Sequence, residues 1–267
     1  MTETLITSTQ NPRVKDLVRL RTRRHRDAAG LFTIEGYREL TRAIGAGVDL
    51  QEVAYCPSLF LGTNEDSLLA AAEAAGARLI EFAEEPFRKV SYRDRPEGLI
   101  GLAQQFPTGL DRLDLTGAPL ILVVESIEKP GNLGTMLRTA DAAGVDAVIV
   151  CDPTTDPFNP NVVRASIGCL FVVPLAVAST PETLAWLSDR DVRTFAATPA
   201  ADRLHWEADY RGACALAIGS EQYGLSETFL EAADERVRIP MLGDADSLNA
   251  AMAAGVMLYE AIRQRSA

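Results

Sequence analysis

The chain has 267 residues, of which 47% are hydrophobic and 24% charged, and its formal net charge is −11. This length and composition are typical of two globular domains and exclude a disordered or fibrous protein. No apolar run approaches the roughly 20 residues of a membrane-spanning helix, and the first residues lack a signal-peptide pattern, so we expect a cytoplasmic protein.

The negative charge is unevenly distributed along the chain. Residues 1–107 hold 14 Lys and Arg against 15 Asp and Glu, whereas residues 108–267 hold 12 against 22. Within the first part, residues 11–26 carry seven basic side chains and one acidic side chain, that of Asp16. Such a run is either a solvated helix face or a surface that contacts nucleic-acid phosphates, and the pattern by itself leaves both open.

The first part of the chain alternates predicted helices and strands. A basic helix is expected after Asn11 and Pro12, because Asn can cap a helix and Pro at its first position loses no needed donor. Apolar patterns then predict strands at 31–36, 50–57, 77–83 and 98–106, with helices at 37–47 and 67–76. We therefore predict a small α/β domain over residues 1–106 and a linker at 107–118, where Pro, Gly and charged residues combine.

Residues 119–267 repeat the alternation on a larger scale. Residues 119–127 form a continuous apolar strand, as expected when both faces of a parallel sheet are covered. Further strands are predicted at 145–152, 171–177, 192–198, 213–221 and 236–241. Helices are predicted at 132–144, 161–170, 180–190, 226–235 and 247–265. The pattern predicts a doubly wound parallel sheet, whose ligands bind beyond the carboxyl ends of the strands.

Two of the loops that follow strands have unusual residues. In the loop at 128–138, glycines permit a tight turn, Asn132 begins a helix and Arg138 lies on that helix. In the loop at 218–226, Glu221 lies between Gly219 and Gly224. Taken singly, these loops also fit a glycine-rich turn with a surface arginine and a solvated acid.

A third loop, at 238–255, leads into the last predicted helix at Ser247, where this serine fits either a site residue or a helix cap. Neither GxGxxG nor a P-loop is present, which argues against a dehydrogenase and an ATPase. The four cysteines form no CxxC pair, and His25 and His205 are far apart in the sequence. We therefore predict no metal site.

Together, the three loops resemble the motifs of the SpoU/TrmH family of RNA ribose 2′-O-methyltransferases in the SPOUT superfamily. NLGTMLR resembles the first motif, IGSEQYGLS the second, and RIPM with SLNAAMAAG the third, while RASIGCLFVVP resembles the connecting segment. Through NPRVK and FTIEG, the first domain is similar to the L30e-like substrate-binding domain of rRNA-modifying members. The chain also resembles 23S rRNA methyltransferases of the avilamycin- and thiostrepton-resistance type.

The resemblance implies a C-terminal SPOUT domain with a trefoil knot, a homodimer, and S-adenosylmethionine as cofactor. It implies methylation of structured RNA, with 23S rRNA as the expected substrate. The alternatives are tRNA and a non-catalytic RNA-binding protein of the same fold. The positions that match the family's polar catalytic set are Asn132, Arg138, Glu221, Ser247 and Asn249. Those expected to bind the cofactor are Gly219, Ile239, Met241, Leu248 and Asn249.

The basic side chains of the first domain and of the connecting segment are expected to contact RNA phosphates. These residues are Arg13, Lys15, Arg21, Arg23, Arg24 and Arg164. A guanidinium is always protonated in proteins and has no acceptor atom. We therefore expect Arg138 to grip a phosphate and stabilise negative charge on the 2′-oxygen, with the proton passing to phosphate, Glu221 or water.

Overall fold

The computed structural model describes residues 5–266, which divide into two units. The first unit contains the residues up to Phe106 and also residues 156–172, while the second contains residues 107–155 and the residues from 173 onwards. Residues 156–172 thus pack in the first unit, although they lie within the range that we predicted as the second domain. No helix within residues 5–266 is long and apolar enough to cross a membrane.

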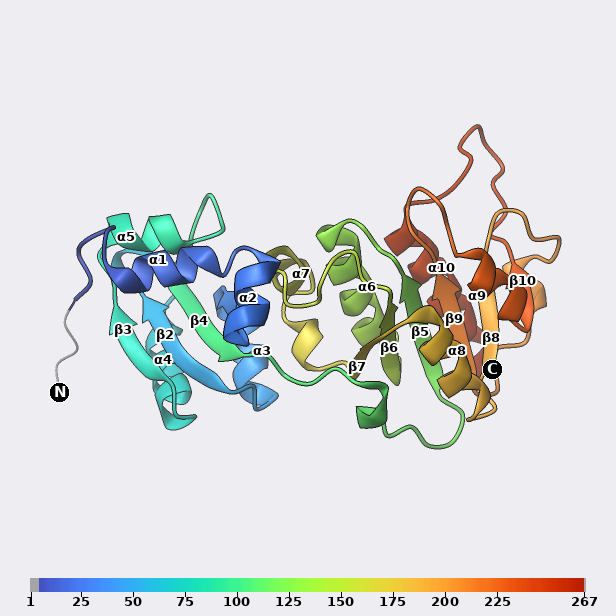
Figure 1. Ribbon diagram of the computed structural model, residues 1–267, viewed down its shortest axis with the longest axis horizontal. Helices are drawn as coiled ribbons and strands as arrows, with labels where there is room; N and C mark the ends of the chain where they lie inside the picture. The colour runs from blue at the N-terminus through green and yellow to red at the C-terminus, as the bar shows by residue number, and fades with distance from the viewer. Residues whose placement is uncertain (1–4, 267) are drawn as a thin grey trace. The chain divides into compact units, whose positions relative to one another are not determined.

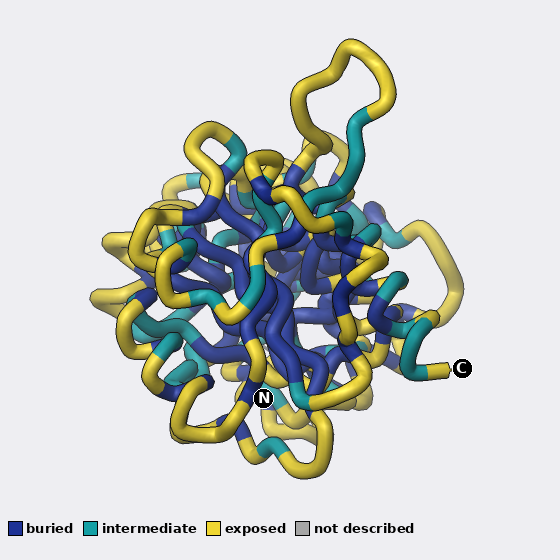
Figure 2. The backbone as a smooth tube through the Cα atoms, turned by 90° about the vertical axis from the view of Figure 1, so that its right-hand side faces the viewer, coloured by how far each residue is buried: buried dark blue, intermediate teal, exposed yellow. Residues whose placement is uncertain are grey.

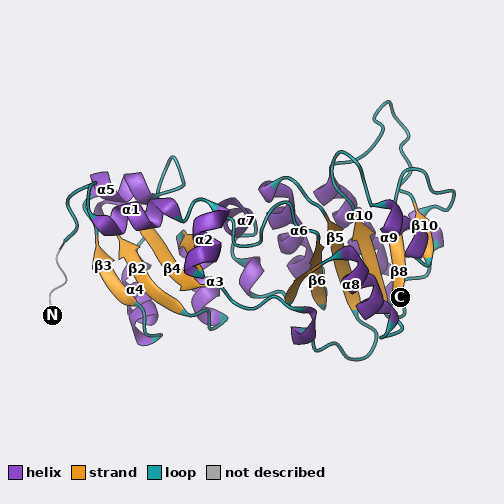
Figure 3. Ribbon diagram, viewed as in Figure 1, coloured by secondary structure: helices purple, strands orange, loops and turns teal. Residues whose placement is uncertain are grey.

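The first unit is built on a mixed sheet of four strands in the order β1-β4-β2-β3 (Figure 3). Strand β4 is antiparallel to β1 and β2, and β2 is parallel to β3. The strands are β1 (Leu31–Glu35), β2 (Leu50–Tyr55), β3 (Arg78–Glu81) and β4 (Leu99–Gln104). The helices are α1 (Pro12–Arg19), α2 (Arg23–Ala29), α3 (Tyr37–Gly45), α4 (Glu65–Ala74), α5 (Glu84–Val90) and α7 (Pro160–Ala165).

The basic segment forms two helices rather than the single helix that we predicted. The predicted start is confirmed, because the Asn11 side chain accepts a hydrogen bond from the Arg13 amide at 2.9 Å. The chain then turns at Leu20, which is buried, and at Thr22, whose backbone is extended. A β-branched residue such as Thr22 suits an extended backbone, and α2 begins after it.

Arg26 is buried, although it belongs to the basic run at residues 11–26, which we expected to be exposed. Its side chain is 1% exposed, and Nη2 pairs with the Asp156 carboxylate at 2.5 Å. Nη1 donates to the carbonyl oxygens of Leu20 and Arg21 at 2.9 and 3.0 Å. Removing one partner of a buried ion pair leaves the other charge without hydration or a counter-charge. Arg26 therefore holds residues 156–172 in the first unit and does not lie on its surface.

The second unit is built on a sheet of six parallel strands in the order β10-β8-β9-β5-β6-β7 (Figure 1), which confirms the predicted parallel sheet. The strands are β5 (Leu120–Glu125), β6 (Ala147–Cys151), β7 (Leu175–Ala178), β8 (Arg193–Ala197), β9 (Cys214–Ile218) and β10 (Glu235–Val237). The helices are α6 (Pro130–Ala142), α8 (Thr180–Ser188), α9 (Glu227–Ala232) and α10 (Ala250–Arg265).

Both faces of this sheet are covered, as the continuous apolar strand predicted. All residues of β5 are buried. Ile121 and Val123 pack in one cluster with Trp186 of α8 and Phe229 of α9. Because side chains alternate along a strand, Leu122 points to the opposite face, where α6 and α10 pack side by side (Figure 1). The strands form the buried centre of the unit, and exposed loops surround it (Figure 2).

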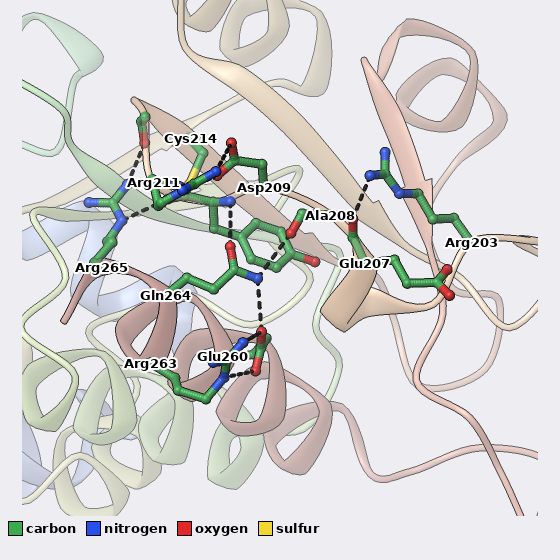
Figure 4. Close-up of polar contacts among 12 residues, drawn as sticks. Arg203, Glu207, Ala208, Asp209, Arg211, Cys214, Glu260, Arg263, Gln264 and Arg265 are labelled. Carbon is green, nitrogen blue, oxygen red and sulfur yellow. Dashed lines mark hydrogen bonds and ion pairs between the residues drawn. The ribbon is translucent and has the colours of Figure 1, made fainter. Parts of the chain in front are cut away.

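The C-terminal end of α10 is tied to the segment that precedes β9 (Figure 4). Arg265 donates hydrogen bonds to the carbonyl oxygens of Tyr210 and Gly212 at 2.8 and 2.6 Å. Gln264 donates to the carbonyl oxygen of Ala208 at 2.9 Å and accepts from the Tyr210 amide at 3.0 Å. These contacts fix the C-terminal end of the helix.

We expect Asp156→Ala to lower the free energy of unfolding by about 3 kcal/mol, because Arg26 would stay buried without its counter-charge. Urea unfolding followed by circular dichroism measures this. The control is Asp27→Ala, which removes the exposed pair between Arg23 and Asp27 at 3.5 Å and should cost far less. Equal losses in the two variants would contradict the role given to Arg26.

Candidate functional site

The three loops singled out in the sequence follow β5, β9 and β10, at the carboxyl ends of the strands in the second unit. Because the strands are parallel, their carboxyl ends lie together. The first loop leads into α6, the second into α9, and the third, residues 238–249, into α10. The third loop extends from the unit (Figures 1 and 2), and all of residues 242–249 are exposed.

Glu221 is the residue on which the first two loops meet. Its carboxylate accepts hydrogen bonds from the backbone amides of Glu128 and Lys129 at 3.1 and 3.3 Å, and from the side-chain amide of Asn132. Burial raises the pKa of the Glu221 carboxyl, but hydrogen bonds from the Glu128 amide and the Asn132 side chain outweigh burial, so the pKa lies below its ordinary value. The anionic oxygen held at the start of α6 is therefore the protein's own carboxylate.

Asn249 connects the third loop to the other two. Its side-chain nitrogen donates to Oδ1 of Asn132 at 3.1 Å, and its own Oδ1 accepts from the amides of Ala251 and Met252 at 3.0 and 3.4 Å. Asn249 thus caps α10, and the alternative that Ser247 caps the helix is wrong. The structure brings Glu221, Asn132 and Asn249 into one hydrogen-bonded chain across three loops.

The second loop has a shape that requires glycine. The amides and carbonyls of Ser220 and Gly224 pair with each other at 3.0 Å in both directions, and Gly224 has φ of +70°. A Cβ atom on Gly219 would lie 2.0 Å from the carbonyl carbon of Gly224. Any side chain at Gly219 would therefore open the turn that presents Glu221.

A cavity of about 510 Å³ lies among these loops. Its lining includes all the residues expected to bind a cofactor, together with Ser247: Gly219, Ile239, Met241, Leu248 and Asn249. This volume suits a small-molecule ligand. Tyr223 also lines the cavity and is exposed, and the sequence analysis did not single it out.

Arg138 lies apart from the hydrogen-bonded chain. It is exposed on α6, and it has no hydrogen bond or ion pair with any residue in the described range 5–266. It follows Asn132 by six residues, which is a rotation of about 240° around a helix with 3.6 residues per turn. Within one chain, α6 therefore presents Arg138 and Asn132 on different faces.

Glu125 holds the end of the second loop through hydrogen bonds, and the sequence did not identify it as a site residue. This buried residue ends β5, and its carboxylate accepts from the hydroxyl of Thr180 at 2.6 Å and from the amide and hydroxyl of Ser226 at 2.6 and 2.7 Å. Ser226 in turn caps α9. Glu125 thereby fixes the end of the second loop. The available signal was an acid at the end of an otherwise apolar strand.

The residues expected to contact RNA all lie in the first unit, and they differ in how far they are already engaged. Lys15 and Arg24 are exposed. Arg13 and Arg23 form ion pairs with Glu52 and Asp27. Arg21 and Arg164 bond to polar groups without a carboxylate partner in the described range.

The sheet and the cavity at its strand ends define an α/β domain with room for a small ligand where three loops meet. The model of the SpoU rRNA Methylase family matches residues 119–259, and the model of the MRM3-like substrate binding domain matches residues 11–101. Because the first match covers more than half of the chain, the chain belongs to the SpoU rRNA methylase family.

Similar proteins agree with this membership, and two solved structures match nearly the whole chain. A crystal structure of an RNA 2′-O ribose methyltransferase is 44% identical, with a TM-score of 0.87, and the match covers 99% of this chain and 100% of that one. The SpoU methyltransferase AviRb from Streptomyces viridochromogenes, solved with AdoMet, is 29% identical with a TM-score of 0.89, covering 96% and 99%. The 23S rRNA (guanosine-2′-O-)-methyltransferase RlmB of Ralstonia nicotianae is 37% identical, covering 74% of this chain and 82% of that protein.

We expect Glu221→Gln to lower the free energy of unfolding by about 1–2 kcal/mol at pH 7, because an amide cannot accept all the hydrogen bonds that the carboxylate accepts. The pKa of Glu221 is lowered in the folded protein, so its stabilisation is present above the ordinary value of 4.5 and is lost as the pH falls through the lowered value. Urea unfolding of the wild type and of Glu221→Gln measures this: the difference in their free energies of unfolding should be smaller at acidic pH than at pH 7. The exposed variant Glu231→Gln is the control, and a difference independent of pH would oppose this assignment.

Proposed function

We propose that this protein transfers a methyl group from S-adenosylmethionine to a ribose 2′-hydroxyl of 23S rRNA. The observation that carries the proposal is the hydrogen-bonded chain of Glu221, Asn132 and Asn249, which joins three loops beside one cavity. The Ralstonia relative is named as a 23S rRNA 2′-O-methyltransferase, and the AviRb structure contains AdoMet. Transfer RNA is the alternative substrate.

The cavity residues fit this cofactor by their chemistry. Ile239, Met241 and Leu248 offer apolar contacts, and the glycine turn at Gly219 leaves backbone groups accessible beside them. When bound, S-adenosylmethionine supplies a methyl group that is already a good electrophile. The task left to the protein is to align the acceptor hydroxyl and to help it lose its proton.

In our proposal, the polar residues orient the acceptor and stabilise charge. Asn132, Asn249 and Ser247 orient the ribose and the loops. The lowered pKa makes Glu221 a weak base, so we assign it the positioning of Asn132 and the α6 loop, while the proton leaves to phosphate or water. Arg138 grips the adjacent phosphate and stabilises the negative charge that develops on the 2′-oxygen.

We further propose that the protein is a homodimer whose interface includes the outer face of α10. Met252 and Tyr259 are 61% and 54% exposed, and with Val256 they form an apolar stripe opposite the buried face of the helix. A second copy would cover this stripe. Because α6 presents Arg138 away from Asn132, we propose that the partner subunit's Arg138 completes each site.

We propose a trefoil knot at the C-terminus; the chain passes from β10 at the sheet edge back to α10, which packs against β9 and α6. The first unit would dock the RNA through Arg13, Lys15, Arg21, Arg23, Arg24 and Arg164. We expect the protein to act in the cytoplasm, on RNA of the ribosome.

We expect methyl transfer from labelled S-adenosylmethionine to unmodified 23S rRNA, with the label mapped to one ribose. Total tRNA serves as the competing substrate in a parallel reaction. Asn132→Ala should lower turnover by about 100-fold, because the three loops lose their common contact, and Thr135→Ala on the exposed side of α6 should not. Label found only in tRNA would refute the choice of substrate, and no label in either RNA would refute the activity.

We expect Arg138→Lys and Arg138→Ala to lower turnover by about 100-fold or more, because a lysine lacks the bidentate geometry. If Arg138 acts across the dimer, two inactive variants should complement each other. An equal mixture of Arg138→Ala and Asn132→Ala should regain about a quarter of the wild-type activity after subunit exchange, since half of the dimers then hold one intact site. No recovery, in dimers shown by mass spectrometry to be mixed, would place Arg138 in its own subunit's site.

A further inference from the structure

Residues 156–172 are held in the first unit by three contacts. Asp156 pairs with Arg26, the Phe158 ring packs on Phe32 with centroids 4.9 Å apart, and the carbonyl of Ile167 accepts a hydrogen bond from Arg42. Asn161 and Arg164 lie on the same segment, at the start and near the end of α7. They fall outside residues 11–101, which match the substrate-binding domain. The surface of this unit therefore contains residues that the domain match does not include.

Tyr92 is the point at which this segment meets the rest of the unit. Its ring is 42% exposed, and its amide is held by the Glu35 carboxylate at 2.7 Å. Asn161 donates a hydrogen bond to the Tyr92 hydroxyl at 3.0 Å, and Arg164 donates to Oδ1 of Asn161 at 3.2 Å. The guanidinium of Arg21 lies 5.9 Å from the centre of the Tyr92 ring. Three segments distant in sequence thus position one exposed aromatic ring.

Arg21 and Arg164 keep their positive charge available beside this ring. Arg21 donates to the carbonyl oxygens of Lys89 and Ser91 at 2.9 and 2.5 Å, and neither arginine has a carboxylate within ion-pair distance in the described range. By contrast, Arg93 is neutralised by Glu39 and Glu97.

A hollow of about 360 Å³ adjoins the ring, and its lining includes Arg21, Arg88, Asp94 and Pro96. Arg88 pairs with Glu84 at 2.8 Å, while both side chains are about half exposed. The surface therefore combines a positioned aromatic ring with accessible positive charge. Tyrosine and arginine are also common at interfaces with proteins, but a positioned aromatic ring beside arginines that have no carboxylate partner in residues 5–266 is typical of sites for single-stranded RNA.

We propose that Tyr92, Arg21, Asn161 and Arg164 form one docking surface that takes an unstacked base from a loop of the structured RNA substrate. This inference rests on the proposed function, which supplies RNA as the ligand class. The Tyr92 ring stacks on the base, and Arg21 and Arg164 contact the flanking phosphates. Asn161 holds the ring and the Arg164 side chain in place. The docking surface is thus composite, because one part comes from the substrate-binding domain and the other from the segment before β7.

The test is the dissociation constant of unmodified 23S rRNA transcript and full-length protein, measured by filter binding. Tyr92→Ala and Tyr92→Leu should raise the dissociation constant by about tenfold. Tyr92→Phe should raise it less, by up to about threefold, since it keeps the stacking ring and loses only the hydrogen bond from Asn161. Arg164→Ala should weaken binding, and it should reduce the slope of the logarithm of the dissociation constant against the logarithm of the salt concentration by about 0.7. Arg78→Ala, which removes a paired arginine on β3, is the control.

Calorimetric titration with S-adenosylmethionine keeps the result interpretable, because every folded variant should bind the cofactor as the wild type does. Wild-type affinity for RNA in Tyr92→Leu or Arg164→Ala would overturn the docking surface. So would a loss in Tyr92→Phe equal to that in Tyr92→Leu, because the ring would then not matter. Binding of ribosomal proteins but not of the transcript would also overturn it. If the wild type methylates neither RNA, the proposed function fails, whereas normal methylation with unchanged affinities in the variants rejects this surface alone.

Discussion

The shared hydrogen bonds of the Glu221 carboxylate are the constraint on which the site depends. The carboxylate holds the loop before α6, and Asn132 passes the connection to Asn249 at the start of α10. The second loop has its own turn at Ser220 and Gly224, and these hydrogen bonds fix the position of the first and third loops relative to it. A carboxylate suits this task because it accepts several hydrogen bonds at once and gains from backbone amides at a helix start. The same bonds lower its pKa, and a group used as a clamp in this way makes a poor proton acceptor.

Much of the fold was predictable because the local patterns agreed with the tertiary environment. The apolar run of β5 predicted a strand covered on both faces, and all its residues are buried. The start of α1 at Asn11 followed from its capping chemistry. The grouping of Asn132, Glu221 and Asn249 followed from the resemblance, together with the rule that parallel strands end at one edge. Local signals suffice where each element's own residues decide its structure.

Other features were not predictable, because they depend on contacts between residues far apart in the sequence. Arg26 stands in a run of arginines, and only the presence of Asp156 beside it makes it a buried residue. The short helix α5 has acidic residues in its first turn and basic residues in its last, yet it is too short for a clear apolar period. Glu125 looks like any strand-end acid until Thr180 and Ser226 are seen to donate to it. The hydrogen bond between Tyr92 and Asn161 was not predictable either, because the two residues are 69 positions apart in the sequence.

The place of residues 156–172 has a consequence for dissecting the chain. The chain passes from one unit to the other three times, after Phe106, after Thr155 and after Val172. A fragment that stops at Phe106 would lack Asp156 and Phe158, so Arg26 would lose its counter-charge and Phe32 a ring neighbour. A fragment that starts after the linker would contain residues 156–172 but lack Arg26 and Phe32, against which they pack. The two units are therefore distinct in space but not separable by one cut, and exchange of either between relatives would have to move two pieces of sequence together.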